Sequence, residues 1–222
     1  MDWTALALSL RLAALTCLLL VPAALALALL LRRLRPGPRR LLQALLALPL
    51  VLPPTVLGYY LLLALGRTSP LGVLWEEVFG RPLVFTFEGI LLASLVFNLP
   101  FALQPLARAV EGLPRHLREA AWLCGFSPLR TFLVVELPLL RPALATALVL
   151  VFAHTLGEFG VVLMVGGAVP GETRTAAVAV YDAVQALDDD TAARMSLALL
   201  GLSLVALLLL QMVEPGRGRH GR

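Results

Sequence analysis

The sequence contains no lysine, so all 18 of its basic residues are arginine. A Walker A phosphate loop needs a lysine on the β- and γ-phosphates, and a Schiff-base enzyme needs a lysine amine. We therefore expect the chain to form no Schiff base and to hydrolyse no ATP by the Walker A route.

Cysteine and charge are also scarce. The two cysteines, Cys17 and Cys124, are far apart in the chain and predict neither a disulfide nor a metal site. Only 14% of the residues are charged and 59% are hydrophobic, with a mean hydropathy of +0.89. Soluble domains average about 25% charged and 45–50% apolar residues, so this composition indicates a membrane protein.

Uncharged stretches approach the roughly 20 apolar residues that a spanning helix needs. Together they predict an all-α integral membrane protein, a single transmembrane domain over residues 1–222 with about five transmembrane helices. The first stretch is longer than a signal-peptide core, so we expect it to be retained. The fifth stretch continues past Glu158 to Gly171, which leaves a sixth, half-embedded piece as an alternative. The stretches are Leu12–Leu31, Leu41–Gly66, Gly89–Ala107, Met195–Val213 and Pro142–Gly157.

The arginines cluster in alternate loops. Five lie in RRLRPGPRR (32–40), five in residues 108–141 and three after Val213. By the positive-inside rule these loops face the cytoplasm, which places the N-terminus outside and the C-terminus inside the cytoplasmic (inner) membrane. The net charge of +4 is thus explained by multi-pass topology, and we expect membrane lipid rather than nucleic acid as a partner.

Prolines border or interrupt most of the predicted spans. Each removes a helix hydrogen bond and frees a carbonyl that lipid cannot satisfy. The densest case is LPLVLPPTVLGYY, where Pro53, Pro54 and Thr55 can open the backbone within the membrane. Such openings are typical of a transport path, although kinking for helix packing would leave the same pattern. The other prolines of this kind are Pro22, Pro49, Pro100, Pro105, Pro138 and Pro142.

The segment 111–142 is too polar to span and too patterned to be a linker. Pro114 favours a helix start and Gly125 a left-handed helix end, which predicts a helix of about ten residues. Ser127 is expected to cap a second helix that runs toward the membrane. The first helix has the residues to dock on a partner protein, and composition alone leaves open whether it lies on the bilayer instead.

Glu119, Ala120, Ala121 and Gly125, followed by Pro138 and Pro142, resemble the EAA loop of type-1 ABC importer permeases. This resemblance implies a cytoplasmic coupling helix that sits in a cleft of an ATP-binding subunit. Arg118 and Ser127, beside these residues, are included in the implied coupling site.

A narrower resemblance covers nearly the whole chain. LPLVLPPTVLGYYLLLALGR (48–67), LGEFGVVLMVGG (156–167) and PGETRTAAVAVYDAVQ (170–185) look like molybdate ABC importer permeases, and sulfate and thiosulfate permeases share the frame. The resemblance implies a homodimer, two ATP-binding subunits that hold ATP and Mg, and an extracytoplasmic oxyanion-binding protein. It implies no cofactor bound by this chain.

His154 and Glu158 lie four residues apart in a predicted span, on either side of Gly157. A metal would need three or four ligands, so we expect no metal site. A hydrogen-bonded pair that holds helices together and a gate on the transport path both remain open. Further along, Glu172 and Arg174 follow a turn and precede a short helix expected within 175–187. Arg174 either pairs with Glu172 or meets the anion or the binding protein.

The resemblance implies a permease that conveys molybdate, with tungstate as a second candidate, by alternating access. A sulfate or thiosulfate permease is the alternative from the same frame. A membrane scaffold would need neither a docking loop nor repeated prolines. An intramembrane enzyme would need a nucleophile and base that the sequence does not offer, so we expect the chain not to be an enzyme.

Overall fold

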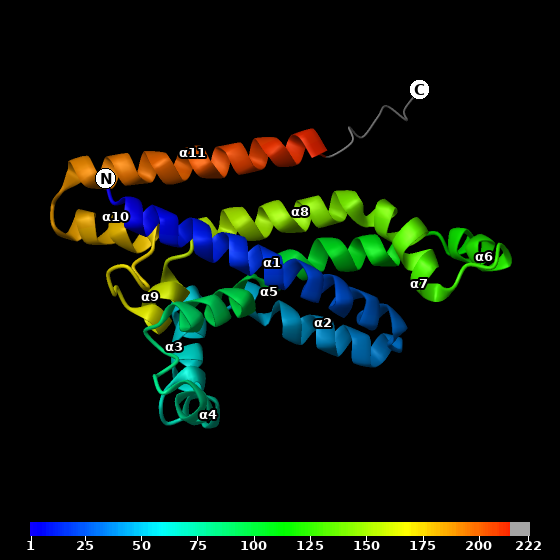
Figure 1. Cartoon of the computed structure of the whole chain (residues 1–222), viewed down its shortest axis with the longest axis horizontal. Helices are drawn as coiled ribbons and strands as arrows, with labels where there is room; N and C mark the ends of the chain where they lie inside the picture. The colour runs from blue at the N-terminus through cyan, green and yellow to red at the C-terminus, as the bar shows by residue number, and fades with distance from the viewer. Residues whose placement is uncertain (214–222) are drawn as a thin grey trace.

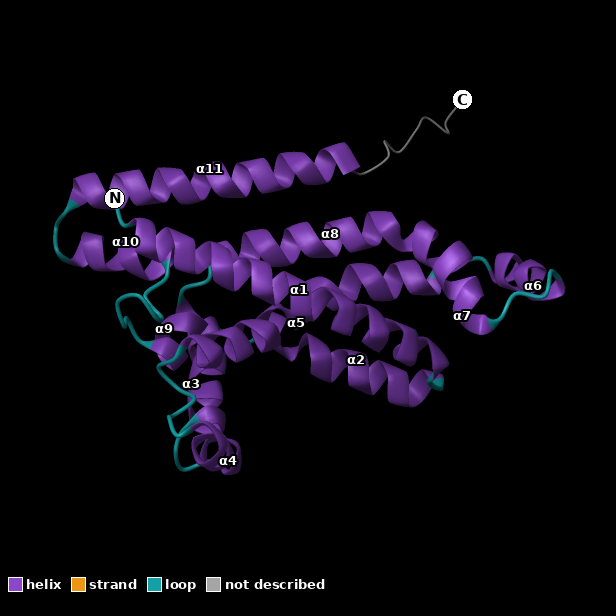
Figure 2. Ribbon diagram, viewed as in Figure 1, coloured by secondary structure: helices purple, strands orange, loops and turns teal. Residues whose placement is uncertain are grey.

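The computed structural model describes residues 1–213 of the chain, and every element in that range is a helix (Figure 2). The predicted all-α class is therefore confirmed. Three of the predicted cytoplasmic arginines, Arg217, Arg219 and Arg222, lie outside the described residues.

Four helical segments are long and apolar enough to cross a membrane, or five if one bent pair counts as a single span. The segments are α1 (Trp3–Arg33), α5 (Phe87–Glu111), the run Pro128–Leu156 and α11 (Asp189–Val213). That run consists of α7 (Pro128–Thr131), the π-helix η1 (Phe132–Glu136) and α8 (Leu137–Leu156). The bent pair is α2 (Pro36–Val51) and α3 (Pro54–Leu65). The expectation of about five spans agrees with this result.

The long helices α1, α5, α8 and α11 run roughly parallel or antiparallel to one another (Figure 1). The N-terminus, α9 (Gly160–Gly166) and α10 (Ala176–Gln185) gather at one end of the bundle, which we name the α10 end. The helices α3 and α4 (Pro70–Phe79) turn away from the bundle axis near that end. At the opposite end, the α6 end, α6 (Arg115–Leu123) and α7 project beyond the other helices.

The central core lies between α1, α5 and α8, which pack against one another. Small residues allow the close approach: Ala24, Ala102 and Ala147 are completely buried, with Leu106 and Val151 beside them. Lipid tails are as apolar as the helix surface, so the hydrophobic effect does not drive helices together in a membrane. Close packing through small residues drives their association instead. The last helix, α11, packs on α8 and α10 and leaves a row of leucines exposed. In a bilayer this face is covered by lipid or by another chain.

The stretch Leu41–Gly66, predicted as one span, forms two helices that meet at 110°. The break falls at Leu52 and Pro53, as the proline pair suggested. Neither Pro53 nor Pro54 has an N–H, so the α2 hydrogen-bond ladder ends there, and Pro54 begins α3 at the helix position that tolerates proline.

The other prolines do not break their helices. The expected interruption is wrong at five positions that lie inside continuous helices: Pro22, Pro49, Pro100, Pro105 and Pro142. The prediction that a span starts at Pro142 is also wrong, because the helical run begins at Pro128. Just before Pro138 the chain is π-helical, and the Leu137 N–H donates to the Phe132 carbonyl five residues back. This wider turn accommodates the missing N–H of Pro138.

The helix α11 starts at Asp189, six residues before the predicted stretch Met195–Val213. The Asp188 side chain caps this helix: its Oδ1 accepts a hydrogen bond from the Thr191 N–H at 3.1 Å. Hydrogen bonds from Thr191 lower the pKa of the Asp188 carboxyl. One turn along the helix, Asp190 Oδ2 and Arg194 Nη2 form an ion pair at 3.2 Å.

Gly58 sets the contact between α3 and α9. A Cβ atom at this position would lie 2.7 Å from Met164 Cβ and 3.2 Å from Val161 Cα. We predict that Gly58→Leu lowers the free energy of unfolding by about 1–3 kcal/mol, because overpacking forces neighbouring groups apart. The measurement is the thermal unfolding midpoint in detergent.

Gly201→Leu serves as the matched control, because nothing lies within 4 Å of a Cβ at Gly201 on α11. Leucine is also the better helix former by up to about 1 kcal/mol, so this midpoint is expected to hold or rise. Equal losses in the two variants would contradict the packing argument.

Candidate functional site

Two helix breaks from distant parts of the sequence meet in this fold. The first lies between α2 and α3, and the second spans residues 157–159 between α8 and α9. They are in direct contact, because a Cβ on Gly160 would lie 2.9 Å from Pro54 Cβ. A cavity of about 490 Å³, which we name the break pocket, lies between them. Its lining residues are Pro54, Thr55, Phe97, Ala153, His154, Gly157, Glu158, Phe159 and Gly160.

The break pocket thus collects most of the residues predicted for a path or gate. Pro54, Thr55, His154, Gly157 and Glu158 all line it. Three members of that group do not line it: Pro53 is the residue at which the chain turns into α3, and Glu172 and Arg174 lie elsewhere. The structure therefore brings together residues about 100 positions apart that sequence reasoning had selected separately.

His154 and Glu158 form no hydrogen bond or ion pair with each other. The predicted helical spacing fails because α8 ends at Leu156, and Gly157 and Phe159 leave the helical conformation. Asn98 on α5 joins them instead: its Oδ1 lies 2.9 Å from His154 Nδ1, and its Nδ2 donates to Glu158 Oε2 at 3.2 Å. Since an amide oxygen only accepts, Nδ1 of His154 is the protonated nitrogen in this arrangement.

Ser94 completes this buried polar network. Its hydroxyl donates to Glu158 Oε2 at 2.5 Å, and Asn98 Nδ2 also donates to the Ser94 carbonyl at 2.9 Å. Ser94 and Asn98 are fully buried, and Glu158 is 4% exposed. The network ties α5 to the α8–α9 break, which supports the hypothesis of hydrogen bonding that holds helices together.

The surroundings of the network are largely aromatic and apolar. Phe97 and Phe101 lie with ring centroids 5.0 and 4.0 Å from that of His154. Within the described residues, Glu158 Oε1 has no hydrogen-bond partner. A carboxylate oxygen without a partner in such a setting is costly, which marks the break pocket as the place where a further polar group can bind.

Sequence reasoning missed Ser94 and Asn98. Both lie inside a predicted apolar span, four residues apart, and therefore on one face of the helix. Polar side chains at that spacing within a span are a recognisable signal for a buried hydrogen-bonding face.

Glu172 and Arg174 lie outside the break pocket and do not pair with each other. Arg174 bonds Asp182 through Nε and Asp2 through Nη1, each at 2.6 Å. Glu172 instead pairs with Arg81, with Oε1 and Nη1 3.8 Å apart. The expected salt bridge between Glu172 and Arg174 is therefore wrong, and Arg174 fastens the start of α1 to α10, the short helix predicted within 175–187.

The predicted docking helix is present as α6. Its N-cap is Pro114, and Gly125 after its C-terminal end has φ +78°, the left-handed conformation expected there. The Ser127 hydroxyl accepts from the Arg130 N–H at 3.3 Å, so the predicted cap of the second helix is confirmed. Ala121 is buried, whereas Trp122 and Leu123 are 50% and 91% exposed. The helix therefore presents an uncovered apolar side at the α6 end.

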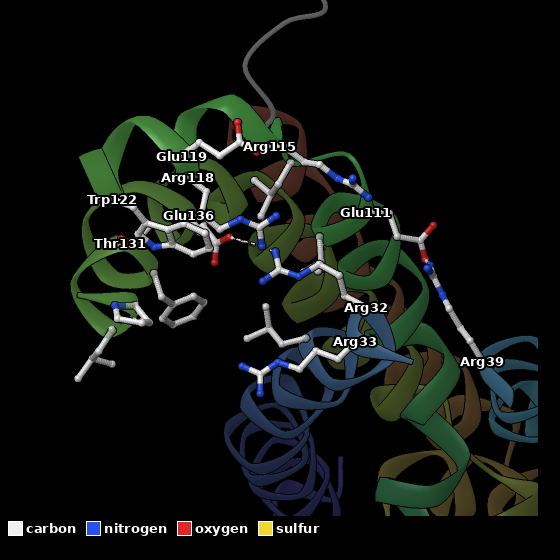
Figure 3. Close-up of a pocket in the computed structure, with 16 residues that line it drawn as sticks. Arg32, Arg33, Arg39, Glu111, Arg115, Arg118, Glu119, Trp122, Thr131 and Glu136 are labelled. Atoms are coloured by element: carbon white, nitrogen blue, oxygen red, sulfur yellow. Dashed lines mark hydrogen bonds and ion pairs between the residues drawn. The ribbon is translucent and has the colours of Figure 1, made fainter. Parts of the chain in front are cut away.

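An ionic cluster connects this docking helix to the membrane-spanning helices. Glu136 of η1 lies 3.0 Å from Arg32 of α1 and 3.7 Å from Arg118 of α6 (Figure 3). Glu136 is 7% exposed, so the attraction is only weakly screened by water. We call these three residues the Glu136 cluster. Arg118 was predicted to belong to the docking site, but Arg32 and Glu136 were missed because they are distant in sequence.

Glu119 and Ala120 are exposed on α6. In the described part of the chain Glu119 makes no ion pair, so its carboxylate remains available to a partner. Across residues 1–213, no three His, Cys, Asp or Glu side chains come together as a metal site requires.

Comparisons with known proteins agree with this geometry. The family described as "binding-protein-dependent transport system inner membrane component" matches residues 20–219. The chain is similar to the molybdenum transport system permease protein ModB of Azotobacter vinelandii, with 46% identity over 84% of this chain and 83% of that protein. It is also similar to the probable sulfate transport system permease protein cysT of Nephroselmis olivacea, with 34% identity over 81% of this chain and 62% of that protein.

A solved structure supports the fold. A chain of the bacterial alginate ABC transporter, in complex with an alginate pentasaccharide-bound periplasmic protein, matches with a TM-score of 0.73. The match covers 95% of this chain and 76% of that chain at 18% identity. The arrangement of helices therefore recurs in an ABC importer.

The buried network yields a stability prediction. Asn98→Leu leaves His154 and Glu158 without their shared partner, and each unsatisfied buried group costs about 1–3 kcal/mol. We expect the thermal unfolding midpoint in detergent to fall clearly. The control is Thr146→Val, which removes a hydroxyl bonded only to the Pro142 carbonyl of its own helix. An Asn98→Leu midpoint equal to that of the control would show that the network contributes no stability.

Proposed function

Because this chain belongs to the family of binding-protein-dependent transport system inner membrane components, we propose that it is the permease subunit of a molybdate ABC importer. In this role it forms the path by which the oxyanion crosses the cytoplasmic membrane. The observation that carries the proposal is the combination of the molybdenum permease similarity over most of the chain with a docking helix at one end of the bundle.

Molybdate is favoured over sulfate by the comparisons. Identity is 46% to the molybdenum permease and 34% to the probable sulfate permease, and the chain spans a larger share of the former. Tungstate, a tetrahedral dianion like molybdate, is a second candidate for the same path. Sulfate or thiosulfate remains the alternative substrate class.

The partners of the proposed importer follow from its parts. ATP and Mg belong to two ATP-binding subunits that dock on the α6 helices, since this lysine-free chain has no Walker A loop. An extracytoplasmic oxyanion-binding protein delivers the anion, and two copies of this chain form the path between them. The chain itself binds no cofactor in this proposal and is no enzyme.

The proposed orientation follows from charge. The α6 end carries the arginine-rich segments 32–40 and 108–141, so it faces the cytoplasm. The N-terminus and α10 then lie outside, and the five traversals bring the end of α11 to the inside. Arg174 and Glu172 lie near the outer surface, within reach of the binding protein.

Transport in this proposal proceeds by alternating access. Closure of the ATP-binding subunits moves α6, and the Glu136 cluster passes that motion to α1 and, through η1, to α8. At its far end α8 carries the break that lines the break pocket. An ionised Glu158 would repel a dianion, so its network with Ser94, Asn98 and His154 acts as a gate rather than as an anion ligand.

The proposal is tested by uptake of labelled molybdate and labelled sulfate at nanomolar concentration, in cells with the chain deleted and then restored. Selective loss and recovery of molybdate uptake is the expected result. Selective loss of sulfate uptake would keep the permease and change its substrate. Unchanged uptake of both anions, in a strain without a second importer, would instead favour the membrane scaffold.

Coupling through α6 can be tested at Gly125. Valine in the left-handed conformation costs about 1–2 kcal/mol, which displaces the α6–α7 turn although nothing lies within 4 Å of the added Cβ. We expect Gly125→Val to reduce molybdate uptake by about 5–30-fold, the equivalent of that strain, while the permease still copurifies with its ATP-binding partner.

Gly37→Val is the matched control. Gly37 lies in the first turn of α2, within the other arginine-rich segment, has equal open space and needs no positive φ. Its effect should stay within about 0.5 kcal/mol, or roughly twofold. Equal uptake in the two variants would argue against coupling through this turn.

A further inference from the structure

A second, larger cavity lies at the α6 end, far from the break pocket. Its volume is about 920 Å³, and we name it the arginine cavity. The ends of α1 and α5 form one side, and α6, α7 and η1 form the other (Figure 3). The proposed transport path and gate do not account for this space.

Five arginines and three glutamates line the arginine cavity, which leaves a surplus of two positive charges. Arg32 and Arg118 share Glu136, and Arg39 pairs with Glu111. Among the described residues, Arg33 and Arg115 form no ion pair, although both line the cavity. Their guanidinium groups are thus available to an anion, and guanidinium forks match phosphate oxygens well.

The two unpaired arginines are also the accessible ones. Arg33 and Arg115 are both exposed. By contrast, the Thr131 hydroxyl and Arg39 Nε, which lack a hydrogen-bond partner within the described chain, are closed to solvent. A ligand in the cavity is therefore held by the open guanidinium groups and not by these buried atoms.

The size and the remaining lining favour a lipid headgroup over a free ion. About 920 Å³ lies at the upper end of cavities that hold drug-sized ligands, far more than a single tetrahedral ion needs. Leu29, Val110 and Phe132 provide an apolar wall next to the arginines. Leu29 precedes Arg33 by one helical turn on α1, so the apolar wall lies on the membrane side of the charges.

We propose that the arginine cavity binds the phosphate headgroup of an anionic phospholipid, held by Arg33 and Arg115. Basic pockets between transmembrane helices at the cytoplasmic side are typical binding sites for such headgroups. The bound lipid lies directly beside the Glu136 cluster, so it also stabilises the junction between α6 and α1. This site is independent of which oxyanion the permease transports.

The test uses the full chain copurified with its ATP-binding partner in detergent and stripped of lipid. Native mass spectrometry counts bound lipid during titration with phosphatidylglycerol and, separately, with phosphatidylcholine. We expect phosphatidylglycerol to bind preferentially. Each arginine near an anionic headgroup contributes about 1 kcal/mol, so Arg33→Gln and Arg115→Gln should each weaken binding about fivefold, and the double variant about 30-fold.

Arg40→Gln is the matched control, because Arg40 lies in the same arginine-rich end but does not line the cavity. It should bind phosphatidylglycerol like the wild type. Unfolding midpoints and copurification with the partner show whether the double variant is intact. A double variant that is intact and still binds like the control would overturn the proposal, as would equal binding of the two lipids by the wild type.

A further arm distinguishes lipid from free anion. Inorganic phosphate and molybdate are added to the lipid-bound complex, with sodium chloride at equal ionic strength as reference. We expect both anions to displace no more lipid than chloride does. Specific displacement by phosphate or molybdate would assign the cavity to a free oxyanion and overturn the lipid assignment.

Discussion

Hydrocarbon offers no hydrogen-bond partner to a peptide group, and the architecture of this chain depends on that constraint. A helix that breaks inside a bilayer must place its freed backbone groups against protein or a water-filled cavity. Here the α2–α3 and α8–α9 breaks lie against each other, with Gly160 next to Pro54. Each break therefore lies against protein, and the break pocket lies between them.

The same constraint explains why polar side chains concentrate at this point. Glu158 follows a helix end, so its carboxylate is directed to α5 rather than along α8. Asn98 satisfies both Glu158 and His154, and a one-residue rotation of α5 would remove both contacts. The network thus fixes the rotation of α5 relative to the break. Within the described residues, Glu158 Oε1 keeps no hydrogen-bond partner.

At the α6 end of the bundle, ion pairs rather than a buried hydrogen-bond network join the elements. The Glu136 carboxylate pairs with Arg32 of α1 and with Arg118 of α6, so it links the docking helix to a spanning helix. A short amphipathic helix with an uncovered apolar side, and a partly buried ionic junction behind it, is suited to transmit movement. The arginine cavity lies beside this junction. A phospholipid bound in it, as proposed, would therefore lie next to the residues that link α6 to α1.

The sequence by itself determined the features that depend on local chemistry. Apolar length set the spans, paired prolines set the first break, and Pro114, Gly125 and Ser127 set the docking helix. Tertiary structure alone decided which side chains meet: Asn98 between His154 and Glu158, Arg174 with Asp2, and Glu136 with Arg32. Hydropathy and missing N–H groups act within a few residues, whereas such contacts depend on how each helix is rotated about its axis. That rotation is set by packing across the whole bundle.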